Sequence, residues 1–344
     1  MSDPILPTEV LEPARWPRDV HVIYPIRRRY WLHILLFLAT VFTTLVVGAR
    51  LQYNFSQGLP QFQSDADIFP LQWALRHPES LVLGIPFSVT LLGILLAHEM
   101  GHFIYAQRNH VYATLPFFLP APTLIGTMGA FIRIRSPIRT RAALFDIGIS
   151  GPIAGFVVAL PVLLISLMAS RPAVVQPTDS GLVLGFPLIF RAAWSSLHPH
   201  GTLHLAQLSL SPVAIAAWVG MFATSLNLLP GGQLDGGHIV YALAPRSHKL
   251  VSRVAVLALV PLGVFCWVGW LIWAVLLLVS LMRHPPVPEY PTLDRKRKLV
   301  GCFALLMFVL TMLPIPFSQI DRNCGVQPAG VWQMFHHPPK CRPW

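Results

Sequence analysis

Residues 97–102 read Ala-His-Glu-Met-Gly-His and carry side chains that could bind a metal ion and activate water. His98 and His102 are four residues apart, so on a helix both side chains lie on one face and can bind the same ion. Glu99 lies beside them, where its carboxylate can take a proton from water. A catalytic zinc usually has three protein ligands, so a third ligand must come from elsewhere in the chain.

The strongest source of a third ligand is the segment 227–238, Asn-Leu-Leu-Pro-Gly-Gly-Gln-Leu-Asp-Gly-Gly-His. Here Pro230 and two pairs of glycines interrupt an apolar helix, and Asp235 lies at the interruption. Irregular backbone at membrane depth is tolerated only where it is packed in protein or lines a wet cavity. The segment therefore indicates a site at Asp235, with His238 as a fourth ligand or, more simply, a neighbour of that site.

The composition is that of a protein that crosses a membrane several times. Hydrophobic residues make up 54% of the 344 residues and charged residues 11%, against about 25% charged in a soluble domain. Apolar segments long enough to suggest crossings lie at residues 31–49, 81–107, 142–169, 213–230, 251–282 and 299–314. The fifth segment is too long for one crossing of about 20 residues. We expect it to form a helical hairpin that turns near residues 261–269.

The distribution of Lys and Arg predicts the orientation, because positive residues collect in cytoplasmic loops. With a cytoplasmic N-terminus and two crossings in the hairpin, most basic residues fall inside, including residues 27–29, Arg133, Arg135 and 295–298. We expect an all-α polytopic membrane protein with about seven transmembrane segments and an extracytoplasmic C-terminus. This topology accounts for the net charge of +11. The expected environment is the lipid bilayer, and no nucleic acid is expected as a partner, because no nucleic-acid-reading module is recognisable.

The third apolar segment carries further small and acidic residues. Asp146 begins this segment, where an acidic residue suits a helix N-terminus. Gly148, Gly151 and Gly155 have the small-residue spacing that lets transmembrane helices pack closely. We therefore interpret these residues as structural, with the catalytic helix as a possible neighbour.

The two motifs together resemble the site-2 protease family of intramembrane zinc metallopeptidases, which carry His-Glu-x-x-His on one transmembrane helix and Leu-Asp-Gly on a later one. Residues 126–132 (Gly-Thr-Met-Gly-Ala-Phe-Ile) and 146–155 are similar to the plastid and cyanobacterial branch of that family. The resemblance covers residues 30–315. The loops and tails are too short for the PDZ or CBS domains of some members, so we expect neither.

This resemblance implies one Zn²⁺ per chain, bound by His98, His102 and Asp235, with Glu99 as the catalytic base. Asn227 matches the family's Asn before the Asp motif, which implies a role near the substrate or the oxyanion. The implied function is a zinc-dependent intramembrane endopeptidase, which cuts peptide bonds in or near transmembrane helices. The substrate would be a single-span membrane protein.

The substrate must unwind before it is cut, since a helix in lipid shields its carbonyl groups. Residues 124–135 mix β-forming residues with glycines and end in alternating apolar and Arg residues, which suits a small membrane-associated β-hairpin or edge strand after the catalytic helix. Strand addition there would hold the substrate extended beside the zinc. The alternative is a surface hairpin without substrate contact.

The motif lies close to Gln107 and Arg108, which open a cytoplasmic loop, so the cut should fall in the cytoplasmic half of the substrate helix.

Two other functions use the same residues. A membrane-anchored protease with its site in water would need a Glu ligand on a later soluble helix, but Glu289 is the only Glu after Glu99 and lies among prolines. A metal or solute transporter that uses the same His, Glu and Asp cluster is the other alternative, although no inverted repeat supports it.

Three regions complete the expected organisation: a cytoplasmic N-terminal segment (1–30), an intramembrane metalloprotease domain (31–317) and an extracytoplasmic C-terminal tail (318–344). Acidic residues near the N-terminus argue against an organelle transit peptide. We therefore expect a multi-pass protein of the bacterial inner (cytoplasmic) membrane. Cys324 and Cys341 lie in the tail, where a disulfide between them is an open alternative.

An outer loop contains His198, His200 and His204, which could bind a metal. An ordinary solvated loop is the simpler interpretation of these three histidines.

Overall fold

The computed structural model describes residues 30–62, 69–172, 182–199, 205, 208–281, 292–321 and 325–328. Predictions for the N-terminal segment, Glu289, His200, His204 and both tail cysteines lie outside these residues. The helices are α1 (Tyr30–Ser56), α2 (Leu71–Arg76), the 3-10 helix η2 (Pro78–Gly84), α3 (Ile85–Arg108), α4 (Arg141–Met168), α5 (Leu188–Leu197), α6 (Pro212–Asn227), α7 (Asp235–Leu243), α8 (Pro245–Phe265), α9 (Gly269–Leu281) and α10 (Arg295–Thr311).

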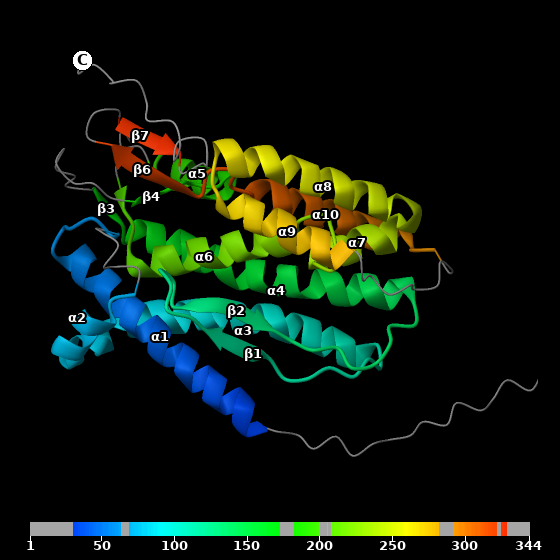
Figure 1. The fold of residues 1–344 in the computed structure, drawn as a ribbon, viewed down its shortest axis with the longest axis horizontal. Helices are drawn as coiled ribbons and strands as arrows, with labels where there is room; N and C mark the ends of the chain where they lie inside the picture. Colours follow the sequence, from blue (N-terminus) through cyan, green and yellow to red (C-terminus); the bar gives the residue numbers. More distant parts are fainter. Residues whose placement is uncertain are drawn as a thin grey trace, which may run out of the picture.

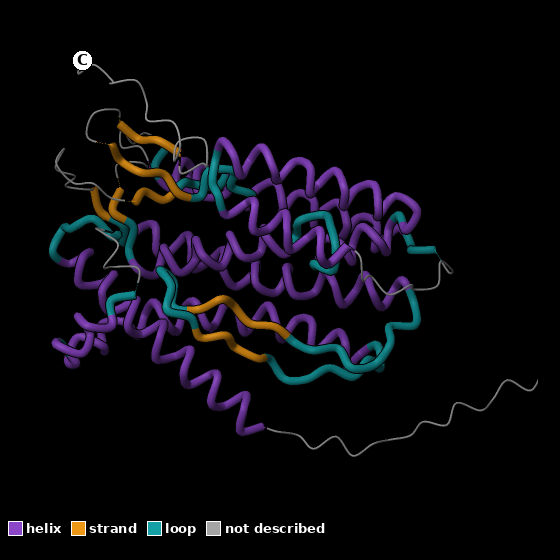
Figure 2. The backbone as a smooth tube through the Cα atoms, in the orientation of Figure 1, coloured by secondary structure: helices purple, strands orange, loops and turns teal. Residues whose placement is uncertain are grey.

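The strands are short and form three small sheets. They are β1 (Phe117–Pro120), β2 (Thr127–Phe131), β3 (Arg171–Pro172), β4 (Leu182–Leu184), β5 (Leu208–Ser209), β6 (Phe317–Asp321) and β7 (Gly325–Pro328). β1 pairs with β2, β3 with β5, and β6 lies between β4 and β7. The sheets of β3–β5 and of β4, β6 and β7 gather at one end of the helices (Figure 2).

Four helical segments among the described residues are long and apolar enough to cross a membrane: α1, η2 with α3, α4 and α8. α6 and α9 are apolar but shorter. The long helices lie side by side across the molecule (Figure 1). The predicted mainly helical membrane protein with small β elements is confirmed, whereas seven crossings stay a prediction. In the fifth apolar segment, α8 ends at Phe265 and α9 begins at Gly269.

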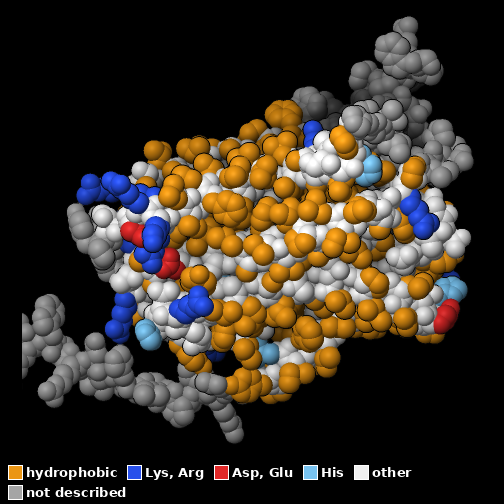
Figure 3. Space-filling view, turned by 180° about the vertical axis from the view of Figure 1, so that it is seen from behind, with side chains coloured by type: hydrophobic (Ala, Val, Ile, Leu, Met, Phe, Trp, Pro, Cys, Tyr) orange, Lys and Arg blue, Asp and Glu red, His pale blue; other side chains and the backbone are white. Residues whose placement is uncertain are grey.

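Helices α3, α4 and α6 contact one another and form the centre of the molecule. Large side chains such as Leu91, Leu163 and Met221 are fully buried there. On the outside, large hydrophobic side chains are exposed, for example Trp31 of α1 and Leu257 of α8. Figure 3 shows a broad hydrophobic band on one face of the molecule, with Lys and Arg side chains towards the two ends. This surface suits lipid around the middle and water at the ends.

Helix α4 begins at a polar cap and tolerates two internal prolines. The Thr140 hydroxyl accepts a hydrogen bond from the Ala143 N–H at 3.1 Å, which satisfies one of the free donors of the first turn. Pro152 and Pro161 lie inside the helix. Transmembrane helices accept proline where neighbouring groups satisfy the freed backbone. α4 can therefore run unbroken beside the motif helix α3.

Strands β1 and β2 form an antiparallel hairpin that packs on α1. Phe117 lies opposite Phe131, and an isolated bridge between Ala113 and Ile134 extends the pairing. At the hairpin loop, Thr43 of α1 donates a hydrogen bond to the Gly126 carbonyl at 2.6 Å. Gly126 has a φ of +77°, and a Cβ there would overlap the backbone of Thr43. The loop can approach α1 this closely because residue 126 is glycine.

Candidate active site

The motif helix α3 brings three polar side chains into the centre of the molecule. His98, Glu99 and His102 are 6%, 6% and 7% exposed. The rings of His98 and His102 lie one turn apart and turn towards each other, with their Nε2 atoms separated by 3.1 Å. The sequence spacing therefore produces the shared face that was predicted for the two histidines.

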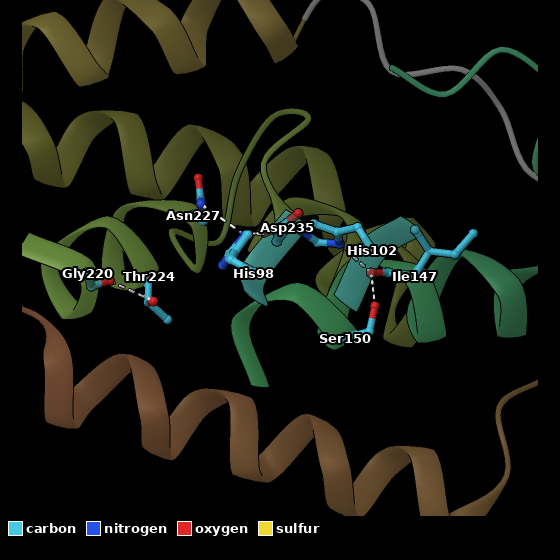
Figure 4. Close-up of polar contacts among 8 residues, drawn as sticks. All are labelled: His98, His102, Ile147, Ser150, Gly220, Thr224, Asn227 and Asp235. Atoms are coloured by element: carbon cyan, nitrogen blue, oxygen red, sulfur yellow. Dashed lines mark hydrogen bonds and ion pairs between the residues drawn. The ribbon is translucent and has the colours of Figure 1, made fainter. Parts of the chain in front are cut away.

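Asp235 is the first residue of the short helix α7, and its side chain points at the two imidazoles (Figure 4). Its Oδ2 atom lies 3.3 Å from Nε2 of His98 and 3.2 Å from Nε2 of His102. These residues form the one group of His, Cys, Asp or Glu among the described residues whose ligand atoms could share an ion.

This triangle of atoms fits a zinc ion. Donors at tetrahedral corners about 2.0–2.1 Å from a common centre lie about 3.3–3.4 Å apart, and two His nitrogens with a carboxylate oxygen are a known catalytic zinc set. Glu99 and Asp235 also bring two carboxylates into a buried site, where a divalent cation would balance their charge. The donor atoms, their spacing and the charge all suit one Zn²⁺.

The backbone of α4 fixes the ring of His102. Nδ1 of His102 lies 2.7 Å from the Ile147 carbonyl oxygen, which also accepts a hydrogen bond from the Ser150 hydroxyl at 2.8 Å (Figure 4). A carbonyl can only accept, so Nδ1 carries the hydrogen and Nε2 of the neutral ring keeps its lone pair for a metal.

Glycines of α4 make room for the two imidazoles. A Cβ atom at Gly151 would overlap the ring of His102, and one at Gly155 would lie 3.3 Å from Cβ and Nδ1 of His98. The close packing predicted from this glycine spacing is confirmed. The neighbours of Gly151 and Gly155 are the motif histidines themselves, so these two glycines do more than bring two helix backbones together.

Glu99 and the β1–β2 hairpin meet in one cavity of about 230 Å³. The Glu99 carboxylate interacts with the backbone N–H of Ile132, directly after β2. Ala130 and Phe131 of β2, Leu144 of α4 and Leu234 before α7 also line the cavity. The candidate base therefore faces a space with both polar and apolar lining residues, and the strand forms one wall of that space.

Three further polar residues surround the imidazoles. Asn227 ends α6 and places its Nδ2 atom 3.3 Å from Nε2 of His98. Gln233 and His238 line the same cavity. His238 is not part of the group with a shared ion position, and a Cβ at Gly148 would lie 3.2 Å from the Cβ of His238.

Sequence reasoning did not find several supporting contacts. Arg297 of α10 pairs with both carboxylate oxygens of Asp146, at 2.8 and 2.6 Å. Asp146 lies six positions into α4, so an ion pair with a distant helix replaces the predicted role at the helix N-terminus. Of the outer-loop histidines, His198 is described, and it stacks on Trp194 with ring centroids 3.9 Å apart.

Comparison with known proteins finds similarity to a peptidase family and to proteins named as zinc metalloproteases. A family model described as Peptidase family M50 matches residues 86–269. The chain is 30% identical over 312 residues to a protein of Arabidopsis thaliana named "Probable zinc metalloprotease EGY1, chloroplastic", a match that covers 87% of this chain and 55% of that protein. It is also 30% identical over 273 residues to the Arabidopsis protein named "Probable zinc metalloprotease EGY2, chloroplastic", covering 77% of this chain and 47% of that protein. The chain thus spans about half the length of these relatives.

Proposed function

This chain belongs to peptidase family M50, and we propose that it is a zinc-dependent endopeptidase that cuts its substrates within the membrane. The observation that carries this proposal is the convergence of three ligand atoms, with Glu99 beside them, among helices long and apolar enough to cross a bilayer. A carboxylate in lipid costs about 2.5–3.5 kcal/mol on insertion scales. Two carboxylates at this position are explained by a bound cation.

Five polar residues of the site have a proposed role in hydrolysis. Zinc bound by His98, His102 and Asp235 would supply a Lewis acid that makes water more acidic and polarises the scissile carbonyl. Glu99 takes the proton from the attacking water and delivers it to the leaving amine. The amide of Asn227 donates a hydrogen bond to the substrate oxygen on which negative charge develops.

The hairpin edge gives the substrate a place to bind in extended form. The Arg133 carbonyl accepts from the Thr114 N–H at 3.0 Å, and the Arg135 N–H donates to the Tyr112 carbonyl at 2.8 Å, so both residues pair with the segment 112–114, which precedes β1. Backbone groups of alternate residues point to opposite edges of a strand. Ile132 and Ile134 therefore direct their backbone groups away from that segment, and both residues line the cavity. The Ile132 N–H already interacts with Glu99, so the edge for pairing consists of the Ile132 carbonyl and the backbone groups of Ile134. We propose that an unwound substrate segment pairs with this edge as an added strand.

The proposal also covers the substrate, the orientation of the enzyme in the membrane and the membrane in which it lies. We propose a single-span membrane protein as substrate and a cut in the cytoplasmic half of its helix, with the N-terminus of the enzyme in the cytoplasm and its C-terminus outside. The names of the plant relatives place those proteins in the chloroplast. For this chain we propose the cytoplasmic membrane of a bacterium.

The decisive experiment compares the purified wild type with Glu99→Gln in proteoliposomes that contain a single-span substrate. Glu99→Gln should keep zinc, because the three ligands are intact, and should lose cleavage, because the amide cannot accept the proton. Its matched control is Gln107→Glu at the exposed end of α3, which should cleave like the wild type.

Two results would contradict the proposal. Cleavage by Glu99→Gln at the wild-type rate would remove Glu99 from the chemistry. Zinc flux across the liposome membrane that survives Glu99→Gln, without cleavage by the wild type, would favour a transporter.

A further inference from the structure

Helix α7 carries Asp235 and depends on its surroundings for its position. It is nine residues long, shorter than the roughly 12–15 residues at which an isolated helix becomes even marginally stable. A helix advances about 1.5 Å per residue, so a slip by one residue would move the carboxylate out of reach of the imidazoles. Packing on α4 and α8, together with contacts at the two ends of α7, therefore fixes where its first side chain lies.

Arg141, the first residue of α4, holds the C-terminal end of α7. Its Nε atom donates to the Ala242 carbonyl at 2.8 Å, and Nη2 contacts the same oxygen and donates to the Leu243 carbonyl at 3.2 Å. The last carbonyls of a helix lack partners within it and attract positive charge. Arg141 is only 6% exposed, unlike Arg139 two residues earlier, which is exposed. A role as a topology anchor at the lipid surface does not explain its burial.

Two hydroxyl groups of the α8–α9 hairpin hold the loop that leads into α7. Ser252 of α8 accepts a hydrogen bond from the Gly232 N–H at 3.3 Å. Ser280 of α9 accepts one from the Gln233 N–H at 3.2 Å. Gly232 has a φ of +60°, and a Cβ there would overlap the Ser280 hydroxyl. The loop thus lies directly against both serines and reaches Asp235 two residues later.

We propose that Arg141, Ser252 and Ser280 are positioning residues, which hold α7 at both ends and so place the Asp235 carboxylate at the zinc position. This inference rests on the proposed zinc peptidase function. It gives the α8–α9 hairpin a defined task, since its serines fix the loop before the ligand. It also gives Arg141 a role in the metal site, which the exposed Arg139 does not have.

The test measures the metal site directly in the full-length protein in detergent. Zinc affinity is determined by competition with a chromophoric chelator, and the visible absorption of the Co²⁺-substituted protein reports the ligand geometry. The variants are Arg141→Met, Arg141→Lys and the double variant Ser252→Ala with Ser280→Ala. The controls are Arg139→Met and Ser166→Ala, because the buried Ser166 hydroxyl donates to Leu163 within its own helix.

Zinc affinity should fall about 10-fold to 100-fold in Arg141→Met and in the double serine variant, the usual effect of removing groups that orient metal ligands. The Co²⁺ spectrum should change in both. Arg141→Lys should be intermediate, because it keeps the charge and loses the planar fork. Both controls should match the wild type.

Wild-type zinc affinity and Co²⁺ spectra in folded variants would overturn the proposal. If Arg141→Met does not fold, the double serine variant decides, since it removes only two oxygen atoms. A wild type that binds zinc and cleaves substrate, with variants that bind zinc equally well, refutes the positioning role alone. A wild type that binds no zinc overturns the proposed function and this inference with it.

Discussion

Replacing Gly151 with alanine tests how closely α4 packs against the metal site. The new methyl group would overlap Nε2, Cδ2 and Cε1 of His102. Carbon atoms in contact normally lie about 3.5–4.0 Å apart, so the imidazole or α4 must move by about 1 Å. Metal–ligand distances tolerate changes of only about 0.2 Å. The substitution should therefore displace one ligand without changing any residue that contacts the ion.

The expected loss of activity is large. A misplacement of about 1 Å can lower the rate about 100-fold, which equals about 2.7 kcal/mol of transition-state stabilisation at 1.36 kcal/mol per factor of ten. Overpacking should also cost about 1–3 kcal/mol of stability. The assay is kcat/KM on a single-span substrate, together with the zinc content per chain and the Tm.

Two other glycines give a graded comparison. Gly93 lies on the motif helix α3, and a Cβ there meets nothing within 4 Å, so Gly93→Ala should cleave like the wild type. Gly155→Ala brings a methyl group to 3.3 Å from His98 and should lose less activity than Gly151→Ala. If a folded Gly151→Ala retains its zinc and cleaves as fast as Gly93→Ala, the packing argument is wrong.

Three further substitutions or treatments have defined outcomes. Asn227→Ala should keep zinc but lower kcat/KM about 100-fold, the usual loss for one donor to a developing oxyanion; steady-state kinetics and metal analysis measure both. Arg297→Met should lower the free energy of unfolding by about 1 kcal/mol, because the ion pair with Asp146 is partly exposed to solvent, and adding Asp146→Asn should cost little more in a double-mutant cycle. Removing zinc with a chelator should lower the Tm and adding it back should restore it, since a ligand that binds only the folded state stabilises that state.

The proposed zinc ligands could be predicted from the sequence because their chemistry has a local signature. The spacing of His98 and His102 requires only a helix to bring the rings together, and the glycines around Asp235 mark a break where a carboxylate can be presented. The distance between these two segments is a tertiary property. In the sequence, only the resemblance to a known family links the two segments.

The supporting contacts were hidden for physical reasons. Arg141 has the same chemistry as its neighbour Arg139, and only burial distinguishes the two. The partner of Asp146 is Arg297, 151 residues away in the chain, so no local pattern reveals it. The strands at the far end of the helices are two to five residues long, too short for a hydrophobic period to appear.

The group that orients His102 is the main-chain carbonyl of Ile147, and every amino acid carries such a carbonyl. Mutation at codon 147 can change the side chain but cannot delete this acceptor, so the protonation pattern of the ligand is protected against drift at that position. The vulnerable codon is that of Gly151, one helical turn further on, where any other amino acid introduces an obstructing atom. In a family that shares this arrangement, substitutions at position 147 should accumulate as neutral changes, whereas selection should remove substitutions at position 151.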